Sequence, residues 1–238
     1  MDSQAPVSRQ VSPPRTNRRL LAVVASLALL SVLISLGGSW LGRSLVLAGH
    51  TEERTLREIV IGNNVLAVPA NAIRFPEARI DGVTERLDLY LHWPDLEGYT
   101  AEERNAFNNA GGDRQILFLA FEEAAMSRDM TGRLKPIYHQ LIEAEGRDLG
   151  SGMTAYTFTE TSGYRDEELI VGNGATPFVA RCMTGKAASE SLAPCERDVR
   201  LGDELSLSYR FPREMLAQSR ELDQAVFKRA QSFLRTPN

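Results

Sequence analysis

The chain has 238 residues, of which 43% are hydrophobic and 24% are charged, and its formal net charge is −4. This length accommodates one domain, or one domain with an appendage. The composition excludes a disordered chain, a collagen-like fibre and a cysteine-rich mini-protein. The acidic balance also argues against a dedicated nucleic-acid binder, which usually contains a basic domain.

An apolar run from Leu20 to Gly42 divides the chain into two unlike parts. The run is 23 residues long and contains no charge, so at about 1.5 Å per residue it can cross a hydrocarbon core of about 30 Å. Four arginines and one aspartate precede it, and the positive-inside rule then places the N-terminus in the cytoplasm. We expect residues 1–19 to be a disordered cytoplasmic tail and residues 20–42 to be a transmembrane helix in contact with the lipid bilayer.

A cleaved signal peptide is the alternative interpretation of this run. Val46-Leu47-Ala48 resembles a small-residue cleavage site, which leaves open whether the anchor is removed after Ala48. The apolar part of a signal peptide usually has about 7–15 residues, and this run is longer. We therefore favour an uncleaved signal anchor.

The segment beyond the span has its own charge balance. Once residues 1–42 are set aside, 23 basic and 30 acidic residues remain, which gives a charge of −7. Such a domain repels nucleic acid and anionic lipid surfaces. We expect residues 43–56 to be a juxtamembrane segment and residues 57–238 to be an exterior domain. In a Gram-negative cell this arrangement anchors the chain in the inner membrane, with the domain in the periplasm.

Two cysteines, Cys182 and Cys195, lie beyond the span. A nearby pair in an oxidising compartment is expected to form a disulfide. A redox pair normally has CxxC spacing, and a metal site needs more ligands. The sequence therefore favours a structural disulfide across a loop of small polar residues.

Short strands dominate the exterior segment, and the predicted fold class is α+β with a mostly antiparallel sheet. Gly62-Asn63-Asn64 lies between two apolar runs, as in a β-hairpin. Apolar and polar residues alternate in Leu87–Trp93, which is typical of a half-buried strand. The predicted strands are 58–61, 65–68, 72–75, 87–93, 115–122, 154–159, 168–171, 178–183, 198–201 and 204–211.

Three helices are predicted. Thr100 to Glu103 has a capping-box pattern at the start of a helix that runs to about Asn108. Lys135 to Glu145 places Ile137, Leu141 and Ile142 on one face. Arg213 to Leu234 has the clearest helical period, which indicates an amphipathic C-terminal helix packed on the sheet.

The chain lacks the motifs of phosphate loops, dinucleotide sites, nucleophile elbows and HExxH metalloproteases. A three-histidine zinc site would need His50, His92 and His139 to converge, although His50 adjoins the bilayer. We therefore predict no metal and no cofactor.

One local cluster and several acid pairs remain as candidates for chemistry. His92 lies close to Asp95 in the chain, but neighbouring strand residues point to opposite faces, so we expect an exposed His92 beside a buried Trp93. The acid pairs Glu102-Glu103, Glu122-Glu123 and Glu167-Glu168 are expected to be solvated. No nucleophile, base and orienting group can be named together, so no catalytic residue is assigned.

The layout resembles single-pass, membrane-anchored proteins of unknown function from alphaproteobacteria. The residues that carry the resemblance are Arg18-Arg19 with the apolar span, Asn64–Pro76 and Leu91–Leu96. It covers most of the chain and implies a location and an architecture, without an activity.

The leading functional hypothesis is a periplasmic interaction or accessory module of the cell envelope, anchored in the inner membrane and without catalytic activity. It expects a protein partner and no nucleic acid. The competing hypothesis is a membrane-tethered periplasmic hydrolase that uses acidic residues or His92.

Overall fold

The structure is a computed structural model that describes residues 21–34, 49–112 and 114–235. The chain divides into two compact units, Met1–Gly49 and His50–Asn238. In the first unit, residues 21–34 form a helix whose side chains are exposed. No helix among the described residues is both long enough and apolar enough to cross a membrane.

Several sequence predictions concern residues that the structure does not describe. The predicted tail, residues 1–19, lies outside the described residues, as do residue 20 and residues 35–42 of the predicted span. The proposed cleavage position after Ala48 lies outside them as well. The transmembrane helix and the fate of the anchor therefore stay predictions.

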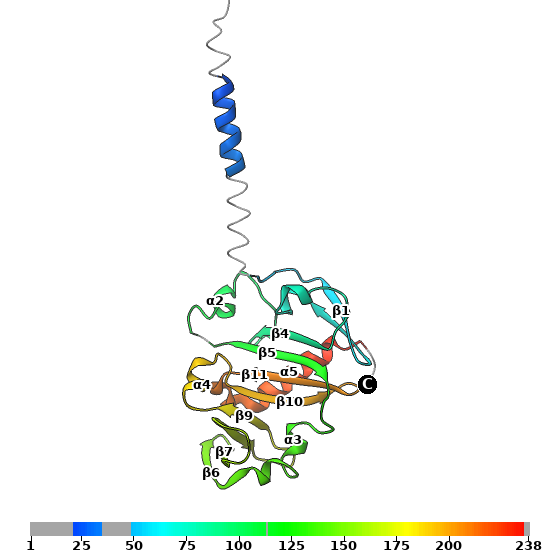
Figure 1. The fold of residues 1–238 in the computed structure, drawn as a ribbon, viewed down its shortest axis with the longest axis vertical. Helices are drawn as coiled ribbons and strands as arrows, with labels where there is room; N and C mark the ends of the chain where they lie inside the picture. The colour runs from blue at the N-terminus through cyan, green and yellow to red at the C-terminus, as the bar shows by residue number, and fades with distance from the viewer. Residues whose placement is uncertain (1–20, 35–48, 113, 236–238) are drawn as a thin grey trace, which may run out of the picture. The chain divides into compact units, whose positions relative to one another are not determined.

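The second unit is built on an eight-stranded sheet with the order β4-β5-β11-β10-β9-β8-β7-β6 (Figure 1). Every neighbouring pair is antiparallel. The strands are β4 (Arg86–His92), β5 (Ile116–Glu123), β6 (Ile142–Gly150), β7 (Met153–Phe158), β8 (Glu167–Gly172), β9 (Val179–Met183), β10 (Cys195–Leu201) and β11 (Leu205–Phe211). The mixed α+β class and the large antiparallel sheet agree with the prediction.

A small second sheet has the order β2-β1-β3. Its strands are β1 (Leu56–Ile61), β2 (Asn64–Pro69) and β3 (Gly82–Val83). The predicted hairpin is confirmed, because β1 and β2 are antiparallel and Ile61 pairs with Asn64 across the turn. Gly62 has a φ of 53°, which glycine adopts without strain. The small sheet and the large one share a single hydrophobic core.

The C-terminal helix packs on one face of the large sheet. It begins as the 3-10 turn η4 (Arg213–Gln218) and continues as α5 (Ser219–Phe233). Leu222, Val226, Ala230 and Phe233 are its buried apolar residues, in the period expected for an amphipathic helix. The predicted helix is therefore present, with its first turn in 3-10 geometry.

The predicted helix over Lys135–Glu145 is wrong. The structure has a short helix α3 (Met130–Arg133), a 3-10 turn η3 (Tyr138–Gln140) and then the edge strand β6. Leu141 and Ile142, which suggested a helix, pack instead against a separate, smaller core that contains Tyr138, and Ile137 is exposed. Most β6 side chains are exposed, so the strand has no alternating pattern that the sequence could display.

Two shorter segments also differ from expectation. The predicted strand 72–75 gives way to the 3-10 turns η1 (Ala70–Ala72) and η2 (Pro76–Ala78), with one bridge from Ile73 to Leu89. The predicted helix 100–108 shortens to α2 (Arg104–Phe107). Flanking prolines explain the first difference, because they interrupt a strand.

Candidate functional site

Alternation along β10 and β11 gives the large sheet two unlike faces. Burial alternates at every residue of both strands. Arg197 and Tyr209 point toward α5, where both contact Asp223. The residues between them face the other way and are mostly polar. On this outer face lie Glu196, Asp198, Arg200, Ser206, Ser208 and Arg210.

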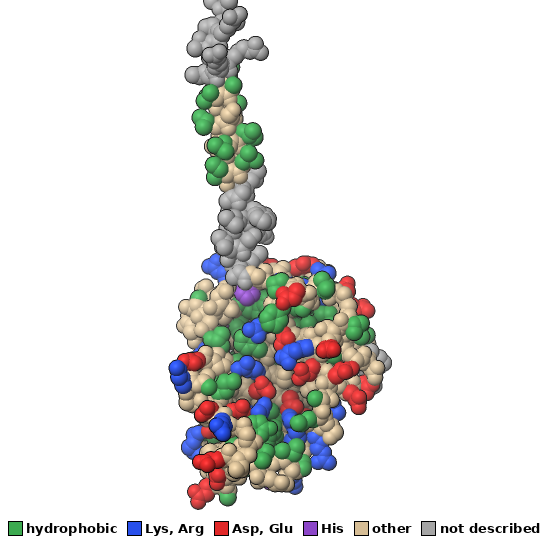
Figure 2. Space-filling model, in the orientation of Figure 1, with side chains coloured by type: hydrophobic (Ala, Val, Ile, Leu, Met, Phe, Trp, Pro, Cys, Tyr) green, Lys and Arg blue, Asp and Glu red, His purple; other side chains and the backbone are tan. Residues whose placement is uncertain are grey.

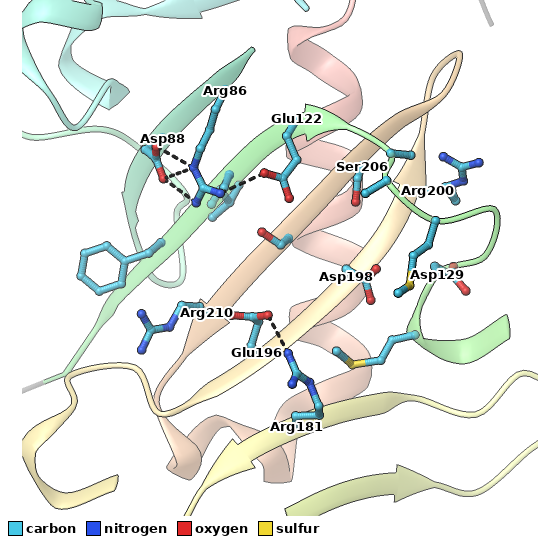
Figure 3. A pocket seen from close by; sticks show the side chains of 18 of the residues that line it. Arg86, Asp88, Glu122, Asp129, Arg181, Glu196, Asp198, Arg200, Ser206 and Arg210 are labelled. Carbon is cyan, nitrogen blue, oxygen red and sulfur yellow. Dashed lines mark hydrogen bonds and ion pairs between the residues drawn. The ribbon is translucent and has the colours of Figure 1, made fainter. Parts of the chain in front are cut away.

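The outer face holds a cleft of about 550 Å³. Its lining comes from five neighbouring strands, β4, β5, β11, β10 and β9, and from the loops around residues 124–130 and 191–193. Figure 3 shows the polar side chains on this face and α5 behind the sheet. Figure 2 shows basic and acidic side chains interspersed over the molecular face in view. The cleft lies across the sheet rather than between domains.

Arg86 links two carboxylates at one end of the cleft. Its Nη2 lies 2.9 Å from Asp88 Oδ1, and its Nη1 lies 2.9 Å from Glu122 Oε2. The hydrogen bonds to Asp88 raise the pKa of Arg86 above its usual value. About half of the Arg86 side chain is exposed, so these pairs add little to stability. Both carboxylates are nevertheless paired with the same arginine.

Two further pairs neutralise carboxylates from β10. Arg133 Nη2 lies 2.6 Å from Asp198 Oδ1. Burial raises the pKa of Asp198, and the charge of Arg133 opposes that shift. Arg181 lies between two acids, 3.2 Å from Glu167 and 3.3 Å from Glu196. These carboxylates therefore have cationic partners within the protein.

The charges in the cleft are unequal in number. Seven arginines and five carboxylates line it. The fifth carboxylate, Asp129, accepts the backbone N–H of Gly132 at the start of α3. Four arginines of the lining form no ion pair in the part of the chain that the structure describes. These unpaired arginines are Arg74, Arg128, Arg200 and Arg210.

Two exposed apolar side chains border the cleft. Met126 is 54% exposed and Leu192 is 41% exposed, and both belong to the lining. Large apolar side chains beside a polar surface are characteristic of protein interfaces, where Met is enriched. Met126 and Leu192 can therefore form apolar contacts with a protein bound at the cleft.

His92 is placed differently from the sequence prediction. It is 8% exposed, whereas Trp93 is only partly buried. The chain turns back after β4, with Leu96 N–H donating to the His92 carbonyl at 2.7 Å. This turn brings Asp95 Oδ1 to 3.3 Å from His92 Nδ1, so the two side chains meet despite their opposite directions on an ideal strand.

Both ring nitrogens of His92 already have partners. Nε2 lies 3.1 Å from Gln115 Oε1 and 3.5 Å from Glu103 Oε2. A general base needs a nitrogen that reaches the substrate or a nucleophile. His92 also does not belong to the lining of the cleft. Its geometry therefore favours a structural role at the turn.

The two members of the Glu167-Glu168 pair have different partners. Glu167 contacts Arg181, whereas Glu168 is held by Arg147 and Arg213 on the other side of β8. Glu168 is 7% exposed, contrary to the expected solvation. Within the described residues, no group of three or more metal-ligating side chains is arranged to hold an ion.

The predicted disulfide is present in the structure. Cys182 on β9 and Cys195 on β10 are register partners, and their sulfurs are bonded. Both residues are fully buried. The loop between them contains the helix α4 (Gly185–Glu190) rather than an unstructured hairpin. The disulfide thus ties together two strands of the sheet beneath the cleft.

A second cavity, of about 1080 Å³, opens beside the start of α5. Its buried charge is Arg197, whose guanidinium donates to Asp223, to Thr131 Oγ1 and to the Val179 carbonyl. This guanidinium has protein acceptors on several sides. The donors of Arg197 are therefore occupied by protein groups, whereas the cleft contains arginines without an ion pair among the described residues.

The cleft residues were not predicted from the sequence. A signal was present, because polar residues alternate with apolar ones through 195–211. That pattern predicts a polar outer face. It does not reveal that β5 and β4 lie beside β11, since they are distant in the chain.

Comparison with known proteins gives a fold but no family. No protein-family model and no curated protein matches the chain. An immunity protein of the Stenotrophomonas maltophilia type IV secretion system has 14% identity and a TM-score of 0.50, over 79% of this chain and 96% of its own. The iron-regulated outer membrane lipoprotein FrpD of Neisseria meningitidis has 11% identity and a TM-score of 0.45, over 79% and 98%.

Proposed function

We propose that this chain is a non-catalytic protein-binding module of the bacterial envelope. In this proposal residues 20–42 anchor it in the inner membrane, and residues 57–238 lie in the periplasm. The partner docks over the cleft on the outer face of the large sheet.

The cleft is the observation that carries the proposal. It combines a polar floor on a rigid sheet with the exposed apolar side chains of Met126 and Leu192. Small-molecule pockets are lined mainly by apolar and aromatic side chains. This cleft is lined mainly by charged and hydroxyl groups, which suits the polar surface of another protein better.

The sequence supports the proposed location. Four arginines before an uncharged run of 23 residues form a signal-anchor pattern. The resemblance to single-pass alphaproteobacterial proteins agrees with this topology. The immunity protein that shares the fold is compatible with a role of this kind.

The competing proposal, a tethered hydrolase, has one observation in its favour. His92 lies beside two carboxylates, Asp95 and Glu103. The occupied ring nitrogens and the turn that buries His92 weigh against it. We therefore prefer the binding module.

Site-specific photo-crosslinking in the native bacterium tests the proposal. A photoreactive phenylalanine analogue replaces Leu192 at the cleft in the full chain. The matched control places it at Phe227, which is 37% exposed on α5 and lies on the opposite side of the sheet. We expect a discrete protein adduct from position 192 that is absent from position 227. No adduct at 192, or the same adducts at both positions, would contradict a partner at the cleft.

A further inference from the structure

We propose that the cleft receives an acidic, extended segment of the protein partner, which the unpaired arginines recognise through its carboxylates. The inference rests on the proposed function and specifies the chemistry of the partner.

Charge complementarity is the first argument. The protein's own acids in the cleft are each held by a protein group. Within the described ranges the unpaired arginines therefore have no carboxylate partner, although the chain as a whole is acidic. An incoming carboxylate forms charge-assisted hydrogen bonds with a guanidinium, often two at once.

Arg200 shows that a donor in the cleft is unsatisfied. Its Nη1 is buried and has no hydrogen-bond partner among the described residues. A buried donor without a partner is costly, and a turn of the Arg200 side chain toward a bound carboxylate would satisfy it. The Arg210 guanidinium donates one long hydrogen bond, 3.3 Å to Ser191 Oγ. Neither guanidinium is thus held by a carboxylate in the part of the chain that the structure describes.

The sheet register separates the arginines into two positions. Arg200 pairs with Ser206, while Arg210 lies four residues further along β11, a distance of about 13 Å on an extended strand. Figure 3 shows Arg200 and Arg210 at opposite ends of the cleft. Two carboxylates separated by about 13 Å can therefore bind at the same time.

Arg74 adds a second positive charge near Arg210. Its guanidinium lies over the Phe118 ring, 4.9 Å from the centroid, and Phe118 is the register partner of Arg210. Stacking on the ring holds the guanidinium without using its hydrogen-bond donors. Arg74 and Arg210 thus form a second basic position opposite Arg200.

The dimensions of the face suit a short peptide segment. The two basic positions are about 13 Å apart along the strands. An extended segment of about four residues covers this distance, so a segment of about six residues reaches both positions. Ser206 lies beside Arg200 and Ser208 lies midway between the basic positions, where their hydroxyl groups can contact a backbone.

The distribution of acids favours a polypeptide over a nucleic acid. Asp88, Glu122, Glu196 and Asp198 are interspersed among the arginines. A polyphosphate backbone carries closely and evenly spaced charge, which would place phosphates against these acids. A peptide can separate its carboxylates and leave neutral residues beside them.

Peptide binding to the full chain in non-ionic detergent tests the inference. The probes are fluorescein-labelled hexaglutamate, hexaglutamine and a thymidine hexanucleotide, and fluorescence anisotropy is measured at low salt. The test variant is Arg200→Gln/Arg210→Gln. The matched control is Arg165→Gln, an exposed arginine in the loop before β8 that forms no ion pair among the described residues. The variant Arg200→Lys/Arg210→Lys keeps both positive charges. It distinguishes a loss of binding through lost charge from a loss through misfolding.

We expect hexaglutamate to bind and the double glutamine variant to weaken it by about tenfold or more. The control variant should bind within about twofold of the native chain, and the lysine variant should retain intermediate affinity. Equal binding of hexaglutamine or of the hexanucleotide, or unchanged affinity in the double glutamine variant, would overturn the inference. If the crosslink at position 192 persists in the double glutamine variant, the acidic segment is also ruled out. The proposed protein partner at the cleft would then still be supported.

Discussion

Asp223 is the residue that joins the large sheet to α5. Its Oδ1 accepts from Arg197 Nε at 2.8 Å and from the Tyr209 hydroxyl at 2.7 Å, and its Oδ2 accepts from Arg197 Nη2 at 3.2 Å. Arg197 is 6% exposed. Burial raises the pKa of Tyr209 well above its usual value, so this hydroxyl stays protonated and donates. One carboxylate thereby neutralises the buried cation on the face opposite the cleft.

Replacing Asp223→Asn should destabilise the fold strongly. The substitution leaves the charge of Arg197 uncompensated in the interior, which typically costs about 3–5 kcal/mol. Urea denaturation of the full chain measures the free energy of unfolding.

The matched control for this substitution is Glu221→Gln on the exposed side of the same helix, with an expected change within about 0.5 kcal/mol. Equal stability of the two variants would show that the Arg197 charge finds another partner or solvent.

At the scale of elements, the sequence predicted most strands because they alternate. The β10–β11 region and the β1–β2 hairpin follow the patterns that identify them. The edge strand β6 escaped prediction because its side chains are exposed on both faces. Leu141 and Ile142 suggested a helix, although they pack against a small core that only the tertiary fold creates.

The Cys182–Cys195 disulfide should stabilise the sheet beneath the cleft. The bond closes a loop with a sequence separation of 13, and the chain-entropy model assigns about 3 kcal/mol to a loop of this size. The variant Cys182→Ala/Cys195→Ala should lose about this amount in urea denaturation.

The control for the disulfide prediction is a reducing agent. It should lower the stability of the native chain and leave that of the double variant unchanged. A loss of less than about 1 kcal/mol in the variant would mean that the β9–β10 pairing needs no covalent support.

At the scale of the whole molecule, the cleft could not be predicted from local patterns. Glu122 and Ser206 are register partners on adjacent strands, although 84 positions separate them in the chain. The sequence indicates that each strand has a polar face. Only the strand order shows which polar faces adjoin, and no local signal encodes that order.

The anchored topology gives a whole-molecule prediction. Intact mass spectrometry of the membrane fraction should find a chain that retains residues 20–42, because the apolar run is longer than that of a cleaved signal. Protease should digest the domain in spheroplasts and spare it in intact cells. A mature chain that starts after Ala48, or a domain that resists protease in spheroplasts, would contradict the anchored arrangement.

The edge strand β6 has a consequence for solubility. It ends the large sheet, so the backbone groups along its outer side are open to another strand. Open edges act as templates for aggregation, and charges and bulges suppress this. The strand carries Glu143, Glu145, Arg147 and Asp148, and its register shifts twice against β7. Copies of this protein are therefore kept from joining into fibres through their β6 edges.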